Sequence, residues 1–177
     1  MVNKILINEK IFVAGSTGMA GSAICRSLLK NGYGPANGGE ILNPSRKQLN
    51  LLDLNQVRKW FKINKPTIVI IAAAKVGGIL SNSTYPTEFL LDNLKIQNNL
   101  IETAWQEGVK RLLFLGSSCI YPKFANQPIR EEYLLDGELE KSNECYAIAK
   151  ISGIKLCEAL REQYNFDAIS CLLYTSD

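Results

Sequence analysis

Short apolar runs rich in β-branched side chains alternate along the chain with longer segments in which apolar residues recur at helical spacing. The apolar runs predict strands at residues 11–14, 40–42, 67–74, 111–116 and 168–172. The segments of helical period predict helices at about residues 19–31, 54–63, 86–107 and 146–164. This alternation is typical of a parallel sheet built from strand–helix–strand units.

Glycine and proline mark where these elements end. We expect the first helix to stop near Gly32, which supplies a left-handed cap, and Pro66 to end the second helix before the next strand. With right-handed crossovers, the order of elements predicts an α/β fold with a Rossmann-like doubly wound sheet. Residues 1–177 are interpreted as one nucleotide-binding domain without internal repeats. The apolar positions of the first helix are Met19, Ile24, Leu28 and Leu29.

A glycine-rich turn lies between the first predicted strand and the first predicted helix. Glycines at such a turn allow a pyrophosphate to come close, while the free N–H groups and the dipole of the helix supply positive potential. The position of the motif between a strand and a helix therefore predicts dinucleotide binding rather than a merely structural turn. The residues of the turn are Gly15, Ser16, Thr17, Gly18, Met19, Ala20 and Gly21.

The end of the second predicted strand indicates which dinucleotide is bound. An NAD site normally has a carboxylate there for the ribose 2′-hydroxyl, but this chain has Arg46 nearby instead. A guanidinium suits the 2′-phosphate of NADP, unless Arg46 is simply a solvated surface charge. Asp53 is placed to accept a hydrogen bond from the adenine amino group or to cap the next helix, and both can be true.

Tyr146 and Lys150 form a Y-x-x-x-K motif inside a predicted helix, so they lie one turn apart on the same face. A nearby ammonium favours the phenolate, which predicts a lowered tyrosine pKa and a general acid. The motif alone is common. Ser117 and Ser118, at the carboxyl end of the fourth strand where the cofactor of such a sheet lies, make the prediction more specific.

Composition and charge exclude several classes of function. The formal net charge is +3 and no polybasic run occurs, which argues against a nucleic-acid partner. No apolar run approaches the roughly 18 residues of a membrane span and no signal peptide is evident, so we expect a cytoplasmic protein with no membrane partner. The chain has no histidine and no Cys-x-x-Cys pair, so its cysteines are interpreted as reduced thiols without a metal. Those other than Cys119 are expected to be small buried side chains, namely Cys25, Cys145, Cys157 and Cys171.

Taken together, these motifs resemble the extended short-chain dehydrogenase/reductase family, and within it the nucleotide-sugar epimerase-reductases. The resemblance runs from about residue 11 to 164 and rests, besides the glycine turn, on AAAKVGG at residues 72–78, GSSCIYP at 116–122, YAIAK at 146–150 and GIKLCE at 153–158. It implies a 3,5-epimerase and NADPH-dependent 4-ketoreductase acting on the GDP-sugar GDP-4-keto-6-deoxymannose. It also implies a homodimer, in which the predicted helices at about 86–107 and 146–164 would form the contact, although their apolar residues can equally pack on the sheet.

The resemblance also implies roles for individual residues. Ser117 would orient the substrate carbonyl, Tyr146 would protonate it, and Lys150 would hold the nicotinamide ribose. Cys119 would handle protons during epimerisation, unless it is a small residue buried under the following turn. The residues implied at the cofactor after the fourth strand are Leu115, Gly116, Ser117 and Ser118, besides Lys150.

The chain departs from the family pattern in several places. Thr17 stands where the family usually carries a basic residue, and the family's histidine partner of the cysteine has no counterpart. After Cys171 the sequence does not follow the family's continuation, so the resemblance implies a truncated substrate lobe and a chain that does not turn over substrate by itself. Two alternatives remain: another NAD(P)-dependent nucleotide-sugar epimerase or dehydratase, against which Cys119 argues, and a non-catalytic NADP-binding module.

Overall fold

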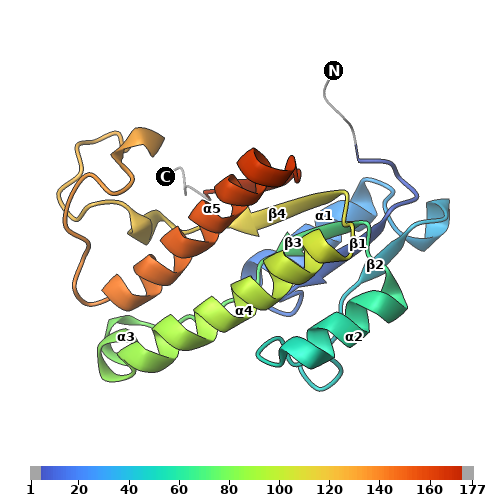
Figure 1. The fold of residues 1–177 in the computed structure, drawn as a ribbon, viewed down its shortest axis with the longest axis horizontal. Helices are drawn as coiled ribbons and strands as arrows, with labels where there is room; N and C mark the ends of the chain where they lie inside the picture. Colours follow the sequence, from blue (N-terminus) through green and yellow to red (C-terminus); the bar gives the residue numbers. More distant parts are fainter. Residues whose placement is uncertain (1–4, 173–177) are drawn as a thin grey trace.

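The computed structural model describes residues 5–172 of the chain. Its centre is a five-stranded parallel sheet in the order β2-β1-β3-β4-β5 (Figure 1). β1 lies between β2 and β3, so the order of the strands reverses beside β1 and leaves a crevice at its carboxyl end. The strands are β1 (Lys10–Ala14), β2 (Glu40–Leu42), β3 (Ile68–Ile71), β4 (Arg111–Leu115) and β5 (Ala168–Cys171).

Helices cover both faces of the sheet (Figure 1). α1 packs on one face, while α2, α4 and α5 pack on the other. α4 and α5 lie side by side over β3 and β4, and this places the Tyr146 helix against the strand that ends at Leu115. The helices are α1 (Met19–Lys30), α2 (Leu54–Asn64), α3 (Ile79–Thr84), α4 (Pro86–Gln106) and α5 (Glu144–Tyr164), with 3-10 turns at Pro35–Asn37, Ser118–Ile120 and Glu131–Tyr133.

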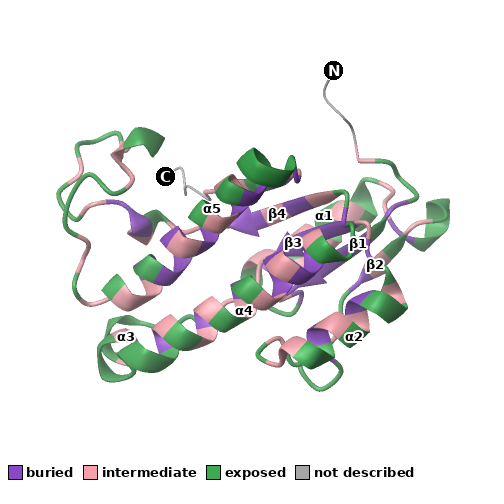
Figure 2. Cartoon of the chain, in the orientation of Figure 1, coloured by how far each residue is buried: buried purple, intermediate pink, exposed green. Residues whose placement is uncertain are grey.

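The core is divided by the sheet into two layers. Alternate residues of β1 enter opposite layers, so Phe12 packs with α2, α4 and α5 while Ile11 and Val13 face α1. The strands β1 and β3 are buried on both faces, as Figure 2 shows by their purple colour, because helices cover both sides of a doubly wound sheet. Because helices cover both faces of the sheet, functional groups are accessible chiefly in the loops that follow the strands.

The helix ends follow the expected chemistry. α1 ends in a Schellman motif, in which the N–H of Tyr33 donates to the carbonyl of Leu28 at 3.0 Å and the N–H of Gly32 donates to that of Leu29 at 3.0 Å. Asp53 caps α2 by accepting a hydrogen bond from the backbone N–H of Gln56 at 3.1 Å. The predicted stop at Gly32 and the N-cap interpretation of Asp53 are confirmed.

Several expectations need correction. The third strand ends at Ile71 instead of Ala74, because β1 ends at Ala14 and the following alanines turn out of the sheet to line a cavity. The segment Ile79–Thr84 forms a short helix, α3, that the apolar pattern did not predict. Met19 is 92% exposed and Leu29 is 56% exposed, so α1 is held on the sheet by Ile24, Cys25 and Leu28. Residues 173–177, part of the segment that departs from the family's sequence pattern, lie outside the described residues, as do residues 1–4.

Candidate functional site

The turn after β1 is shaped by close backbone contacts. Gly15 has a φ of +83°, and a Cβ there would lie 2.6 Å from the backbone nitrogen of Ala73. A Cβ at Gly21 would lie 2.1 Å from the carbonyl oxygen of Gly15. Both positions therefore exclude a side chain: the first lets the turn pass against the end of β3, and the second lets α1 start directly above the turn.

The amino end of α1 opens from this turn. Gly18 occupies the N-cap with extended backbone and makes no side-chain cap, while its N–H donates to the carbonyl of Gly15 at 3.0 Å. The first N–H groups of a helix have no acceptor within the helix, and the helix dipole adds positive potential there. The arrangement is therefore suited to an anion such as a pyrophosphate.

A cavity of about 610 Å³ lies at this end of the molecule. It is lined by the whole glycine turn, by residues 72–76 after β3, and by Pro44, Arg46 and Leu49 after β2. Three strand ends thus contribute to one cleft at the point where the strand order reverses, which is where doubly wound folds bind dinucleotides. The cleft has the volume and the apolar walls that a dinucleotide site requires.

The two residues proposed to recognise the adenosine end have different surroundings. Arg46 is exposed and lines the cleft, so its guanidinium is free to meet a phosphate there. Asp53 does not line the cleft: its carboxylate accepts from the backbone N–H of Gln56 and from the side-chain amide of the same residue at 2.9 Å. The hydrogen bond from the Gln56 backbone holds the pKa of Asp53 below its usual value. A contact of Asp53 with adenine stays a prediction.

The wall of the cleft after β3 is fixed by residues that sequence reasoning did not single out. Asn93, which is 2% exposed on α4, accepts from the backbone N–H of Lys75 at 2.8 Å and donates to the Lys75 carbonyl at 2.9 Å. It also donates to the carbonyl of Phe89 at 2.7 Å. Asp92 binds the Lys75 ammonium at 2.8 Å. These hydrogen bonds and this ion pair fix the backbone conformation of the loop after β3 where it lines the cleft.

A signal for these residues was present in the sequence. Phe89, Asn93, Gln97 and Leu100 follow one another at helical spacing on the buried face of α4. An uncharged polar residue among apolar neighbours on such a face needs a hydrogen-bond partner. That pattern indicates buried anchoring groups, although it does not indicate which loop or helix they hold.

The predicted catalytic residues gather at the carboxyl end of β4. The thiol of Cys119 donates to the Ser117 hydroxyl with 3.2 Å between sulfur and oxygen. Lys150 is only 4% exposed, and its ammonium donates to the carbonyl of Leu115 at 2.8 Å and lies 6.0 Å from the centre of the Tyr146 ring. The structure thus brings together Ser117, Cys119, Tyr146 and Lys150, while the neighbouring Ser118 is exposed.

Burial dominates the proton affinities in this cluster. It raises the pKa of Tyr146 to about 12, with a smaller increase from Cys119 and an opposing effect of a hydrogen bond with Ser117. Burial also lowers the pKa of Lys150 to about 8, against an opposing effect of Cys119, and it raises the pKa of Cys119. The expected lowering of the Tyr146 pKa by Lys150 is therefore wrong for this structure, because burial disfavours the charged phenolate and Lys150 is not among the groups that shift this pKa. Tyr146 is a protonated phenol at neutral pH, as a proton donor must be.

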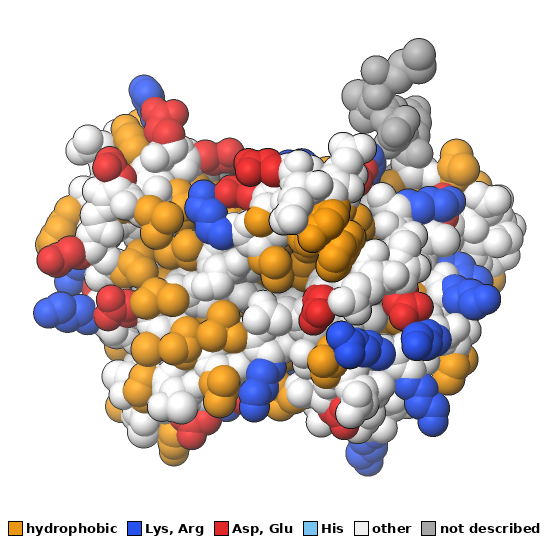
Figure 3. Space-filling view, viewed as in Figure 1, with side chains coloured by type: hydrophobic (Ala, Val, Ile, Leu, Met, Phe, Trp, Pro, Cys, Tyr) orange, Lys and Arg blue, Asp and Glu red, His pale blue; other side chains and the backbone are white. Residues whose placement is uncertain are grey.

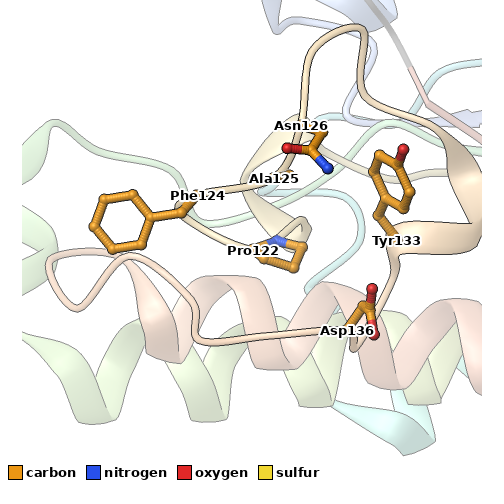
Figure 4. Close-up of a pocket in the computed structure, with 6 residues that line it drawn as sticks. All are labelled: Pro122, Phe124, Ala125, Asn126, Tyr133 and Asp136. Carbon is orange, nitrogen blue, oxygen red and sulfur yellow. The ribbon is translucent and has the colours of Figure 1, made fainter.

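Other parts of the described chain add little chemistry. All of its cysteines are free thiols; Cys157 is buried as expected, but Cys25, Cys145 and Cys171 are partly exposed, because their helix or strand faces are only half covered. Within residues 5–172 there is no cluster of potential metal ligands, and no helix is long and apolar enough to cross a membrane. A small hollow of about 120 Å³ lies within the segment of chain that connects β4 to α5, lined by Tyr133 and Asp136 among others, with Phe124 pointing away from them (Figure 4).

Comparison with known proteins agrees with this geometry. The model of the NAD dependent epimerase/dehydratase family matches residues 11–175. The chain is 54% identical over 163 residues to the putative GDP-L-fucose synthase 2 of Arabidopsis thaliana, covering 92% of this chain and 48% of that protein. It is 52% identical over 168 residues to the GDP-L-fucose synthase of Sinorhizobium fredii, covering 95% of this chain and 52% of that protein.

A solved structure is also similar. The crystal structure of a GDP-D-glycero-L-gluco-heptose synthase from Campylobacter jejuni, in the presence of NADPH, matches with a TM-score of 0.89 and 36% sequence identity. The match covers 96% of this chain and 48% of that structure. The chain therefore spans about half the length of the curated relatives it matches.

Proposed function

The chain belongs to the NAD dependent epimerase/dehydratase family, and from this membership we propose that it supplies the NADPH-binding and proton-transferring groups of a GDP-sugar 3,5-epimerase and 4-ketoreductase. The observation that carries the proposal is the cluster of Ser117, Cys119, Tyr146 and Lys150 at the end of β4, on the same carboxyl edge of the sheet as the glycine turn. The Cys119 thiol, hydrogen-bonded to Ser117, favours this activity over those of other epimerases and dehydratases. It adds a group that can exchange a proton with a carbon acid.

The residues present fit NADPH. Gly15 and Gly21 leave room that a side chain would fill, the amino end of α1 can receive the pyrophosphate, and Arg46 can meet the 2′-phosphate. Lys150, whose ammonium reaches from α5 to the end of β4, would hold the nicotinamide ribose. When bound, NADPH would supply the hydride for the carbonyl carbon. The relative from Campylobacter jejuni was crystallised with the same cofactor.

The reduction needs a proton donor, and Tyr146 supplies it. Its phenol, with a pKa of about 12, would donate the proton to the oxygen of the 4-keto group, and that oxygen becomes a hydroxyl as its carbon is reduced. Ser117 would donate a hydrogen bond to the same oxygen and keep the carbonyl aligned. Lys150 lies one helical turn from Tyr146, so its ammonium would stabilise the phenolate that remains after proton transfer.

Epimerisation requires a proton to leave a carbon beside the ketone and another to return on the opposite face. Burial raises the pKa of Cys119, so the thiol is protonated near neutral pH and is suited to returning a proton. The hydrogen bond with Ser117 places this thiol within reach of a carbonyl bound at Ser117. We propose that Cys119 is the proton donor of the epimerisation.

A chimaera tests the proposal. Residues 11–172 would replace the matching half of the Sinorhizobium fredii relative, and NADPH consumption with GDP-4-keto-6-deoxymannose would be followed by absorbance. We expect turnover by the chimaera, loss of turnover with Tyr146→Phe at nearly unchanged NADPH affinity, and no steady turnover by the 177-residue chain alone, because substrate orientation is a large part of catalysis.

NADPH binding by the chimaera is the control, because it separates a folded cofactor site from the chemical step. A chimaera that binds NADPH but does not reduce the sugar would contradict the proposed activity.

For Cys119→Ser in the chimaera, we expect solvent deuterium to enter the sugar at C3 and C5 about 10²-fold more slowly, which is the effect expected for loss of a general acid. The effect on reduction of an already epimerised sugar should be much smaller. Equal rates of deuterium entry would leave Cys119 with a structural role only.

We also propose that the chain forms a homodimer through α4 and α5. Apolar side chains gather over these two helices on the face shown in Figure 3, and Leu91 and Ile148 are 45% and 41% exposed. Most of the other apolar residues of both helices pack on the sheet, so the contact would rest on the outer faces. Light scattering at several concentrations tests the proposal, and a monomer throughout would refute it.

A further inference from the structure

Gly153 lies one helical turn beyond Lys150 on α5, at a point where β4 approaches the helix very closely. A Cβ on Gly153 would lie 2.5 Å from Cζ and 2.8 Å from Cε1 of the Phe114 ring, and 2.9 Å from Oε1 of Gln97. All of these residues are buried, so no flexible surface group can move aside. The absence of a side chain at Gly153 is therefore what allows both Phe114 and Gln97 to reach α5.

The same two residues are connected to the Lys150 environment. The Lys150 ammonium lies 4.6 Å from the centre of the Phe114 ring, within range of a cation–π interaction, and donates to the carbonyl of the next residue, Leu115. Gln97, which is 2% exposed, donates from its side-chain amide to the carbonyl of Ala149 at 2.7 Å. That carbonyl belongs to the residue directly before Lys150.

We propose that Gly153 and Gln97 are positioning residues for Lys150. Gly153 lets the Phe114 ring lie beside the ammonium, and Gln97 ties α5 to α4 at the residue before the lysine. Gly153 and Gln97 together set the distance and register between α5 and the end of β4. They therefore determine the position of the Lys150 ammonium. The inference rests on the proposed function, in which Lys150 holds the nicotinamide ribose.

The consequence of a methyl group at Gly153 follows from the packing. Buried side chains are close-packed, so the added carbon has to displace either the Phe114 ring or the α5 helix by a substantial fraction of an ångström. Either movement separates the Lys150 ammonium from the ring or from the Leu115 carbonyl. The glycine turn and Arg46 lie at the ends of β1 and β2, away from this contact, and are expected to keep their geometry.

Two ligands distinguish positioning from general damage. NADPH would contact both Lys150 and the glycine turn, whereas adenosine 2′,5′-bisphosphate, its adenosine half, would contact only the turn and Arg46. Binding of each is measured by calorimetry on the 177-residue chain for the wild type, Gly153→Ala, Lys150→Met and the control Gly78→Ala. At Gly78 an added Cβ would meet nothing within 4 Å.

We expect Lys150→Met to weaken NADPH binding by about tenfold to a hundredfold, the range for a hydrogen bond to a charged group. Gly153→Ala should weaken it by about fivefold or more, up to the Lys150→Met value, since it acts through the same contact. Adenosine 2′,5′-bisphosphate should bind all variants within about twofold of the wild type, and Gly78→Ala should match the wild type with both ligands.

The outcomes separate the two hypotheses. If the wild type does not bind NADPH, the proposed function fails, and the positioning role fails with it. If the wild type binds NADPH and Gly153→Ala binds it equally well, or loses both ligands in equal measure, only the positioning role is refuted. Should Gly153→Ala not fold, Gln97→Met decides: it removes the bond to Ala149 with little change of volume, and the same selective loss of NADPH affinity is expected.

Discussion

Replacement of Lys150 by methionine is expected to stabilise the fold at neutral pH, although it removes a group proposed to act in catalysis. The lysine side chain is 4% exposed, and its charge is removed from water with only the Leu115 carbonyl and the Phe114 ring as compensation. Burial therefore lowers the pKa of Lys150 from 10.5 to about 8. A methionine has a similar length and no charge, so it fills the same space without that cost.

The size of the effect follows from the two pKa values of Lys150. Each pKa unit corresponds to about 1.36 kcal/mol, so a fall from 10.5 to about 8 costs the folded state about 3 kcal/mol at pH 7. Loss of the hydrogen bond to the Leu115 carbonyl costs about 1 kcal/mol in the variant. We expect Lys150→Met to be more stable than the wild type by about 2 kcal/mol at pH 7.

The dependence on pH gives the sign of the effect. Between the pKa of about 8 in the folded state and 10.5 in the unfolded state, the unfolded chain binds more protons, so wild-type stability gains relative to the variant as pH rises. By pH 10 the advantage of the variant should have shrunk by about 2 kcal/mol. Cys157 titrates in both proteins and Lys150 is not among the causes of its pKa shift, so its effect cancels in the difference.

Urea unfolding of both proteins at pH 7 and at pH 10, followed by circular dichroism, measures this difference. Lys155→Met is the matched control, because Lys155 is an exposed lysine on the same helix, and it should show little change between the two pH values. A stability difference for Lys150→Met that stays constant from pH 7 to pH 10 would refute the reasoning. A lysine whose pKa is not lowered by burial contributes no change in the free energy of unfolding over this range.

Further predictions concern the cleft and α2. Arg46→Ala should weaken NADPH binding by about tenfold and leave NADH binding unchanged, as cofactor fluorescence would show; equal affinities of the wild type for both cofactors would reject the role of Arg46. Asn93→Ala should lower the free energy of unfolding by about 1–3 kcal/mol in urea, because it leaves the part-buried backbone N–H and carbonyl of Lys75 without this partner, and a loss below about 0.5 kcal/mol would contradict the anchoring role. The pKa of Asp53 is lowered in the fold, so its contribution to stability is present above the unfolded pKa and is lost as pH falls through the folded one; Asp53→Asn should keep the cap and remove this acid dependence of the melting temperature, and an unchanged dependence would contradict it.

Local chemistry was sufficient to predict most of the elements of the fold. The strands and the long helices follow from the period of apolar residues, the stop near Gly32 follows from cap chemistry, and the N-cap at Asp53 follows from a carboxylate before an apolar helical pattern. The glycine turn could be singled out because its backbone geometry is set within a few residues. These features depend on neighbours in the chain, which the sequence shows directly.

The clefts and anchors depend on residues distant in the chain. Asn93 holds the backbone of Lys75 across 18 positions, and Gln97 donates to Ala149 across 52 positions; neither partner can be identified from periodicity. The short helix α3 was missed for the same reason, since it packs on α4 and has no apolar period of its own. The proton affinities of the cluster also needed the fold, because burial reversed the pKa shift expected for Tyr146.

The sequence by itself determined the alternation of strands and helices, the position of the glycine turn and the residues proposed to transfer protons, because each is encoded in a short run of residues. Only the tertiary structure decided how these residues are arranged and solvated. The strand order places the turn and the end of β4 on one edge of the sheet, and the packing of α5 on β4 desolvates Lys150 and Tyr146. Solvation and contact distance are properties of the assembled core, so no local pattern contains them.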